Sequence, residues 1–242
     1  MSVRLSERDL RILTKCAVSK WLTTGQLQRL YFPDVTVDAV RKSLRRLADA
    51  GYMTAYRENR MAEALHTLGP KGKPVLEAKG LEVELFRAPP RQIVHMIGIN
   101  EIRVAVEADP TRVAYFFAAW ELARLGWTHL VIPDAIFAVK LPERHTFLAE
   151  YDRGTEPIEQ LSRKVSVYAN GLSGFPFGAV MLVTDTAERM EAIHRELRLQ
   201  MISLRLLGAT LSGVRADGIY AVKYQNLSAP RGTLIGLRSA VE

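Results

Sequence analysis

Residues 37–51 read Val-Asp-Ala-Val-Arg-Lys-Ser-Leu-Arg-Arg-Leu-Ala-Asp-Ala-Gly. Val40, Leu44 and Leu47 recur every three or four residues, which is the period of one buried face of an α-helix. Gly51 stands where a helix commonly ends in a left-handed residue. The opposite face carries four basic residues that project together: Arg41, Lys42, Arg45 and Arg46. The stretch therefore predicts a helix from about Val37 to Ala50 with one apolar face and one basic face.

The flanking segments predict two more helices and a hairpin. The spacing of a capping box occurs at the start of each of two predicted helices, at Ser6 with Asp9 and at Thr23 with Gln26. Two strand-like runs follow the basic helix, at residues 52–57 and 64–68. Three helices followed by a hairpin is the element order of a winged helix-turn-helix, which we expect over residues 1–88.

A basic helix in this setting predicts contact with double-stranded DNA. Arginine can bond guanine in the major groove or hold a backbone phosphate. The hairpin adds three side chains suited to backbone or minor-groove contact: Tyr56, Arg57 and Arg60. We therefore expect a DNA interface made by the third helix and the hairpin, and the alternative is a solvated basic surface.

The positive charge is concentrated in the same part of the chain. Residues 1–91 contain 17 Lys and Arg against 10 Asp and Glu, whereas residues 92–242 contain 16 of each, so the net charge of +7 belongs to the first third. This asymmetry indicates a nucleic-acid-binding module joined to a neutral one.

Composition and the first residues favour a globular cytoplasmic protein without a membrane segment. Hydrophobic residues make up 48% of the chain, which is enough for a core. No apolar run approaches the roughly 20 residues that a membrane span needs, and charges stand where a signal peptide has its apolar stretch. The single cysteine, Cys16, can form neither an internal disulfide nor a zinc site, and we expect it in the core.

A second domain is expected over residues 92–242, after the linker Ala88-Pro89-Pro90-Arg91, where two prolines disfavour helix. Its elements are predicted in the order helix, three strands, helix, strand, helix and strand, at residues 92–107, 113–120, 135–141, 146–151, 156–170, 178–183, 187–207 and 218–224. This order predicts a mixed sheet flanked by helices, so the fold class of the chain is α/β (α+β).

Acidic residues gather at the ends of two neighbouring strands of this domain. Asp134 begins one strand, and Glu150 and Asp152 end the next on a shared face. A hairpin would bring the three carboxylates together, and Asp134 and Glu150 are then candidate ligands for Mg²⁺, which prefers oxygen and can activate water for phosphodiester hydrolysis. Lys164 and Tyr168, one turn apart on the next helix, could face this site. The alternative is three solvated carboxylates.

The acidic segment resembles the PD-(D/E)xK nuclease core in its Pro-Asp start, its acidic strand end and the helix that follows. The resemblance implies a nuclease-like α/β domain and four catalytic residues if the site is active: Asp134, Glu150, Asp152 and Lys164. Glu101 would match the acidic residue that the first helix of that fold often carries. That family usually has lysine two residues after the acidic position, where this chain has Asp152, and Lys164 would be its relocated equivalent.

The whole chain resembles more closely the replication-relaxation family of plasmids, phages and other mobile elements. Besides the basic helix, the stretches that carry this resemblance are Leu5-Ser6-Glu7-Arg8-Asp9, Leu22-Thr23-Thr24-Gly25-Gln26-Leu27, Pro133-Asp134-Ala135 and Glu150-Tyr151-Asp152-Arg153-Gly154-Thr155-Glu156. It spans about residues 5–185 and implies a role in plasmid replication or DNA topology.

Three functional hypotheses follow. The leading one is a DNA-binding protein whose nuclease-like domain serves as a scaffold, a dimerisation surface or a partner surface. The alternatives are a Mg²⁺-dependent endonuclease targeted by its winged helix, and a transcriptional regulator of a mobile element. The sequence demands no cofactor, and Mg²⁺ is the only one that it suggests.

An apolar stripe on the last predicted helix bears on oligomeric state. Its members are Met190, Ile193, Leu197, Met201 and Leu204. We expect this stripe to pack on the sheet, and a homodimer helix is the alternative.

Overall fold

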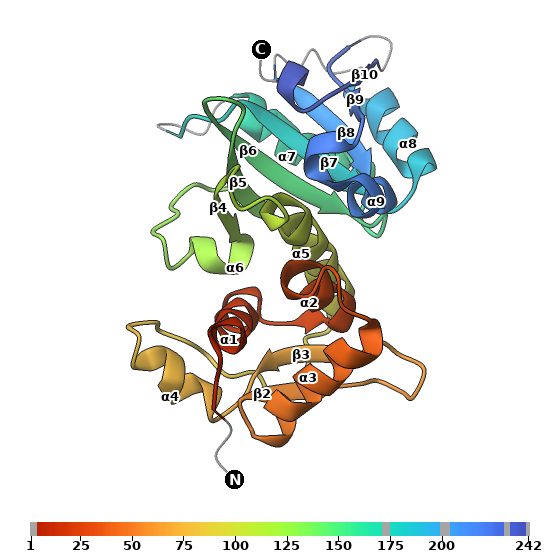
Figure 1. Cartoon of the computed structure of the whole chain (residues 1–242). Coiled ribbons are helices and arrows are strands. Elements are labelled where there is room, and N and C mark those ends of the chain that lie inside the picture. The colour runs from red at the N-terminus through yellow and green to blue at the C-terminus, as the bar shows by residue number, and fades with distance from the viewer. Residues whose placement is uncertain (1–3, 171–174, 199–203, 230–232, 241–242) are drawn as a thin grey trace. The chain divides into compact units, whose positions relative to one another are not determined.

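A computed structural model describes residues 4–170, 175–198, 204–229 and 233–240 (Figure 1). The chain divides into two compact units, residues 1–100 and residues 101–242. Each unit is described by itself.

Three helices form at the start of the first unit, the first two directly after the predicted capping residues and the third ending one residue before the predicted Ala50. They are α1 (Glu7–Ser19), α2 (Thr24–Tyr31) and α3 (Val37–Asp49). Both predicted capping boxes are confirmed, with Ser6 at the start of α1 and Thr23 at the start of α2. Gly51 follows α3 with a φ of 80°, a left-handed conformation that glycine adopts without strain.

A three-stranded antiparallel sheet completes the core of this unit. Its strands are β1 (Leu22–Thr23), β2 (Met53–Tyr56) and β3 (Leu65–Leu68), in the order β1-β3-β2, and the short helix α4 (Gly72–Glu77) follows. The apolar faces of the three helices meet in one cluster that includes Leu13, Cys16 and Leu44. Burial raises the pKa of the Cys16 thiol to about 12, so Cys16 is a core residue as expected.

The first half of α5 (Ile93–Glu107) belongs to the first unit. The Asn100 side chain donates hydrogen bonds to the carbonyl oxygens of Ser19 and Trp21, at 3.0 and 2.8 Å. The Gln26 side chain donates to the carbonyl oxygen of Ile97 at 2.9 Å. These bonds to buried backbone carbonyls tie α5 to α1 and α2, and the division between the units falls after Asn100, later than the linker predicted at residues 88–91.

The second unit is built on a seven-stranded mixed sheet in the order β10-β9-β8-β7-β6-β5-β4. The strands are β4 (Val113–Ala118), β5 (Ala135–Lys140), β6 (Arg144–Asp152), β7 (Ala179–Thr184), β8 (Leu206–Thr210), β9 (Tyr224–Asn226) and β10 (Leu234–Ile235). Strands β6, β7 and β8 run parallel, and the remaining neighbours are antiparallel. The mixed α/β fold class is therefore confirmed.

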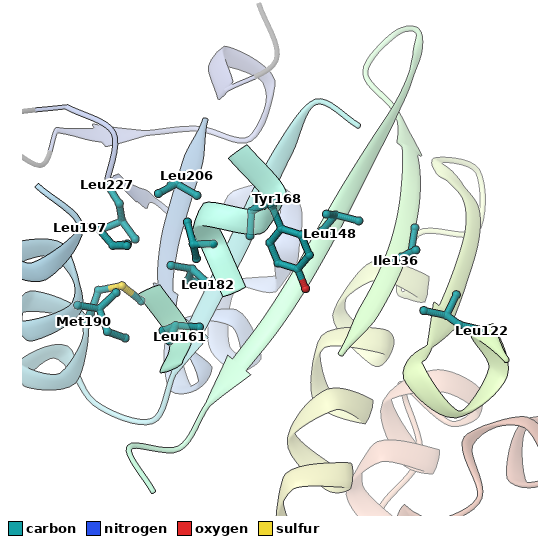
Figure 2. Close-up of a cluster of buried hydrophobic side chains, with 13 residues drawn as sticks. Leu122, Ile136, Leu148, Leu161, Tyr168, Leu182, Met190, Leu197, Leu206 and Leu227 are labelled. Carbon is teal, nitrogen blue, oxygen red and sulfur yellow. The ribbon is translucent and has the colours of Figure 1, made fainter. Parts of the chain in front are cut away.

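Helices cover both faces of this sheet. On one face, α7 (Ile158–Ala169) and α8 (Ala187–Leu197) pack on the strands through a cluster that includes Leu148, Leu182 and Tyr168, part of which is shown in Figure 2. On the other face, Arg103 of α5 lies over the ring of Phe116, 4.6 Å from its centroid. Burial on both faces explains the nearly continuous apolar runs of β5, β7 and β8.

Three predicted elements of this unit are wrong in type or length. The strand predicted over 113–120 ends at Ala118, where the short helix α6 (Ala119–Leu122) begins. The helix predicted over 187–207 ends at Leu197, and Leu206 and Leu207 lie in β8 instead. A fully buried strand has no polar alternation, so its apolar residues read as the continuation of a helical stripe.

The strand predicted over 218–224 is also wrong. The helix α9 (Leu211–Ala221) occupies most of it, with a non-helical residue at Gly218, and β9 begins only at Tyr224. A 3-10 turn, η1 (Arg238–Ala240), follows β10. The glycine interrupts the helical pattern and leaves a short apolar run that resembles a strand.

The apolar stripe of α8 packs inside the second unit. Met190, Ile193 and Leu197 are buried in the cluster that joins α7 and α8 to the sheet. This is the expected packing of the stripe on the sheet. Leu204 packs against the same cluster, and Met201 lies outside the described residues. Among the helices of the described ranges, none is long and apolar enough to cross a membrane.

Candidate functional site

The basic face of α3 is exposed along its length. Arg41, Lys42 and Arg45 are all exposed, while Val40 and Leu44 face the core. Arg41 forms an exposed ion pair with Asp38 at 3.1 Å, one turn away on the same helix. Neither Lys42 nor Arg45 forms an ion pair with another residue that the structure describes. These two cations are therefore available to an external anion.

Arg46, the fourth basic residue of the predicted set, is engaged within the unit. Its guanidinium donates to the buried carboxylate of Asp9 at 2.6 Å, and Asp9 also accepts the backbone N–H of Ser6 at 2.9 Å. Burial alone would raise the pKa of Asp9, but the Ser6 amide and Arg46 outweigh it, so the pKa lies below its ordinary value. Sequence spacing identified Asp9 as a capping residue but carried no signal that Arg46 reaches it.

We expect Arg46→Ala to lower the free energy of unfolding by about 1–2 kcal/mol, the worth of a charged hydrogen bond discounted for the partial exposure of Arg46. The cause is Asp9, whose buried carboxylate would keep its charge and lose a partner. Because the pKa of Asp9 is depressed in the folded state, this contribution is present above its ordinary pKa and is lost as the pH falls below it. Urea unfolding at pH 7 and pH 3 measures the effect, and Arg45→Ala is the matched control. Equal stability of the two variants at pH 7 would contradict this role for Arg46.

A groove with a volume of about 590 Å³ lies between α3 and the β2–β3 hairpin. Three arginines from its two sides line it, Arg41 and Arg45 from α3 and Arg57 from the hairpin. Tyr56 is 39% exposed at the end of β2, with its ring edge-on to Trp21 at 6.4 Å, and Arg60 is exposed in the turn. The structure thus places the predicted hairpin residues on or beside β2, and Arg57 shares the groove with the α3 cations.

His66 forms part of the floor of this groove. The residue is 5% exposed, and its Nε2 lies 3.0 Å from the hydroxyl of Thr24, which also lines the groove. Burial, reinforced by repulsion from Arg57, lowers the pKa of His66 to about 4. The ring is therefore neutral at pH 7. Nothing in the sequence indicated that His66 lines a groove, because the residues around it in space come from other elements.

In the second unit, the structure brings Asp134, Glu150 and Lys164 together. Strands β5 and β6 pair with Ala135 opposite Ala149, which sets Asp134 beside Glu150. Lys164 of α7 donates to Glu150 Oε2 at 2.5 Å, and the Tyr168 hydroxyl donates to Glu150 Oε1. Asp134 accepts the backbone N–H of Tyr151 at 2.8 Å. Lys164 and Tyr168, which were expected to face the acidic site from the following helix, both contact Glu150.

The electrostatics of this cluster are dominated by Glu150, which is 3% exposed. Burial and the neighbouring Asp134 raise the pKa of Glu150 to about 7, although Lys164 and Tyr168 act in the opposite direction. Burial alone would lower the pKa of Lys164, but attraction to Glu150 and Asp134 leaves it above its ordinary value. Lys164 is therefore charged and compensates the two carboxylates.

Asp152 is held by a different cation. Arg189 of α8 donates to its carboxylate at 2.6 Å, and the Gly154 amide donates to it at 2.8 Å. Glu101, the candidate acidic residue of the first helix, is ion-paired with Arg215 of α9 at 2.9 Å. Neither arginine was singled out from the sequence, because each pairs with a residue far away along the chain.

This donor arrangement does not fit Mg²⁺ as it stands. Both oxygens of Glu150 already accept hydrogen bonds, from Lys164 and Tyr168, and Asp152 is occupied by Arg189. Within the described ranges, no three His, Cys, Asp or Glu side chains are grouped so that they could hold a metal ion. The positive charge that a metal would bring is supplied by Lys164.

Comparison with known proteins identifies the family. A family model described as replication-relaxation matches residues 13–174, about two thirds of the chain, including α3 and the Asp134, Glu150 and Lys164 cluster. No curated protein and no solved structure matches the chain. The protein is thus a two-unit α/β protein that belongs to the replication-relaxation family, which confirms the resemblance seen in the sequence. Membership suggests a role in the replication or relaxation of plasmids or other mobile elements.

Proposed function

We propose that the protein binds double-stranded DNA through its first unit, acting as a winged helix-turn-helix in replication or DNA relaxation or in their control. The observation that carries this proposal is the exposed basic face of α3 beside a groove whose other side holds Arg57. Three cations on one helix face and a fourth on the hairpin match the spaced negative charges of a phosphate backbone. The neutral charge balance of residues 92–242 leaves the first unit as the electrostatic partner for DNA. A cytoplasmic location agrees with this role.

The dimensions of α3 support this assignment. A helix of 13 residues is about 20 Å long at 1.5 Å per residue, and the major groove is about 12 Å wide, enough to admit it. In a winged helix the helix reads base edges while the hairpin contacts the backbone or the minor groove. Arg57, Arg60 and Tyr56 lie on or next to β2 and supply the side chains for that second contact.

For the second unit we propose a nuclease-like scaffold or partner surface without catalysis. Lys164 satisfies Glu150 directly and is the group that would have to be displaced before a metal could bind there. A Mg²⁺-dependent endonuclease is the second candidate, favoured by the convergence of Asp134, Glu150 and Lys164. Nicking of supercoiled plasmid with Mg²⁺ or Mn²⁺, lost in Glu150→Gln, would establish that candidate in place of the scaffold.

The direct test of DNA binding is the salt dependence of the full chain's affinity for a duplex. Contacts from three to five cations should make log Kobs fall with log[salt] with a slope of about −3 to −5, since each phosphate contact contributes about −0.9. Fluorescence anisotropy with a labelled duplex between 50 and 200 mM salt, on the order of physiological ionic strength, gives this slope. Absence of binding to duplex DNA at the lowest salt would overturn the proposed function.

A further inference from the structure

The outer face of α1 carries a row of basic residues that the proposed function does not yet use. Arg8 and Arg11 stand one turn apart on this face, and both are exposed. The row is prolonged by Arg4, exposed just before the helix, and by Lys15, partly exposed one turn after Arg11. The helix rises about 10 Å from Arg8 to Lys15, at 1.5 Å per residue, so the row follows the helix for about two turns.

Aromatic rings at the end of α2, and not carboxylates, hold Arg8 and Arg11 in place. The Arg8 guanidinium lies over the ring of the buried Phe32, 4.4 Å from its centroid, and that of Arg11 lies 5.5 Å from the centroid of the Tyr31 ring. Within the described ranges, neither arginine forms an ion pair. A ring attracts a cation without cancelling its charge. Both guanidinium groups are therefore positioned and remain able to bind an anion.

The two acids of α1 leave this positive charge uncompensated. Asp9 is buried and is paired with Arg46 of α3. Glu7 is exposed in the first turn and makes no ion pair with the part of the chain that the structure describes. An exposed positive face without an internal partner fits a polyanion. In a protein that binds duplex DNA, that polyanion is the phosphate backbone.

The ion pair between Arg46 and Asp9 places the row next to α3. The two side chains are 2.6 Å apart, and Asp9 directly follows Arg8 in the chain, so the first turn of α1 lies beside the last turn of α3. Arg46 does not line the groove that α3 shares with the hairpin. The start of α1 thus borders the basic face of α3 away from that groove, and the basic surface of the first unit continues from α3 onto α1.

We propose that Arg8 and Arg11 bind backbone phosphates of the DNA duplex that α3 contacts, next to the α3 site and without reading bases. The proposal rests on the proposed function and extends it from two contacting elements, α3 and the hairpin, to three. Two further phosphate contacts steepen the salt slope expected from α3 and the hairpin by about 1.8, since each contributes about 0.9.

A purely structural role for the two arginines makes a different prediction. If they serve only to cover the aromatic rings, Arg8→Gln/Arg11→Gln should lower the melting temperature and leave DNA binding unchanged apart from the general effect of losing two positive charges. Lys79→Gln/Arg87→Gln measures that general effect, because both residues are exposed cations of the first unit outside α1 and α3. The two double variants have the same net charge, so their difference isolates the contribution of α1.

The test is the affinity of the full chain and its double variants for labelled duplexes of different sequence over a salt series. Arg8→Gln/Arg11→Gln should bind about 10- to 50-fold more weakly at about 0.1 M salt, equally for all the duplexes, with a slope shallower by about 1.8. Lys79→Gln/Arg87→Gln should lose no more than about threefold. Arg8→Lys/Arg11→Lys keeps both charges and should keep most of the slope.

Melting curves establish that each variant is folded at the temperature of the binding measurement. Should Arg8→Gln/Arg11→Gln be unfolded there, Arg11→Gln alone replaces it, and the slope should then be shallower by about 0.9.

The outcomes separate the two proposals. If the unsubstituted protein binds DNA and the glutamine variant of α1 loses no more affinity than Lys79→Gln/Arg87→Gln, the α1 contact is refuted while DNA binding stands. The contact is also refuted if Arg8→Lys/Arg11→Lys loses as much slope as the glutamine variant, or if the loss depends on the sequence of the duplex. If the unsubstituted protein does not bind the duplexes at low salt, both proposals fail.

Discussion

Replacing Arg41, Lys42 and Arg45 together by alanine is expected to reduce the affinity for duplex DNA by at least about 100-fold, because a cationic contact to a base is worth about 1–3 kcal/mol. The three side chains are exposed on one face of α3, and none of them reaches the core. The melting temperature should therefore stay unchanged. Fluorescence anisotropy and a thermal melt on the same preparation measure the two quantities.

The matched control removes the same charge elsewhere in the first unit. Lys79, Arg87 and Arg91 are exposed and do not line the groove beside α3. Their triple alanine variant should lose no more than about threefold in affinity, the effect of net charge alone. Equal losses in the two triple variants would show that α3 is not the contact surface.

Arg45→Ala alone distinguishes base contact from phosphate contact. If Arg45 reads a base, the loss should depend on the DNA sequence. If it holds a phosphate, all sequences should weaken alike and the salt slope should shrink by about one. Arg46 is left out of the triple variant because its loss would unpair the buried Asp9 and confound binding with stability.

Lys164→Met is expected to lower the free energy of unfolding at pH 8 by about 3–5 kcal/mol, the usual cost of removing one partner from a buried ion pair. Glu150 is 3% exposed, and its carboxylate accepts a hydrogen bond from the Lys164 ammonium at 2.5 Å. Without Lys164, a carboxylate charge on Glu150 would be buried beside Asp134 with no cation to compensate it. Arg163→Met, an exposed neighbour on α7, should have little effect. Urea unfolding followed by circular dichroism gives the three stabilities.

The same variant should be less impaired at low pH. The pKa of Glu150 is about 7 in the folded protein, above its ordinary value, so the folded state binds the proton more tightly than the unfolded state. Stability linked to this group therefore falls as the pH rises from about 4.5 to 7. Without Lys164 the pKa of Glu150 rises further, and at pH 5 the carboxyl is neutral in the folded variant. The loss measured at pH 8 should shrink at pH 5.

Two further measurements complete this prediction. The double variant Glu150→Gln/Lys164→Met should recover much of the stability, since it removes the buried charge along with its partner. Mg²⁺ or Mn²⁺ should leave the melting temperature of the unsubstituted protein unchanged, because a ligand raises it only by binding the folded state. A metal-dependent rise that Glu150→Gln abolishes would place a metal at Glu150 and favour the endonuclease.

Elements whose signals are local could be predicted from the order of the residues. Capping residues three positions apart, the apolar period of α3 and the glycine after it define the helices of the first unit, because a helix closes its bonds within four residues. The pairing of the two strands β5 and β6 as a hairpin was also expected, and with it the juxtaposition of Asp134 and Glu150, while their register came from the structure. Of the elements that the sequence mistook, β8 is a buried run in which strand and helix share one pattern, whereas α9 is interrupted at Gly218.

Which charged side chains pair with one another depends on how the elements pack. Arg46 pairs with Asp9, which lies 37 positions away in the sequence, and Glu63 accepts the N–H of Gly25, 38 positions away. In the second unit, Arg189 pairs with Asp152 and Lys164 pairs with Glu150. Residue spacing shows which side chains share a face of one element but not which element packs against that face. A long cation can reach any carboxylate that packing brings near, so its partner follows from the arrangement of helices on the sheet. For that reason the sequence named the basic and acidic residues of this protein, while packing set which of them are free to bind.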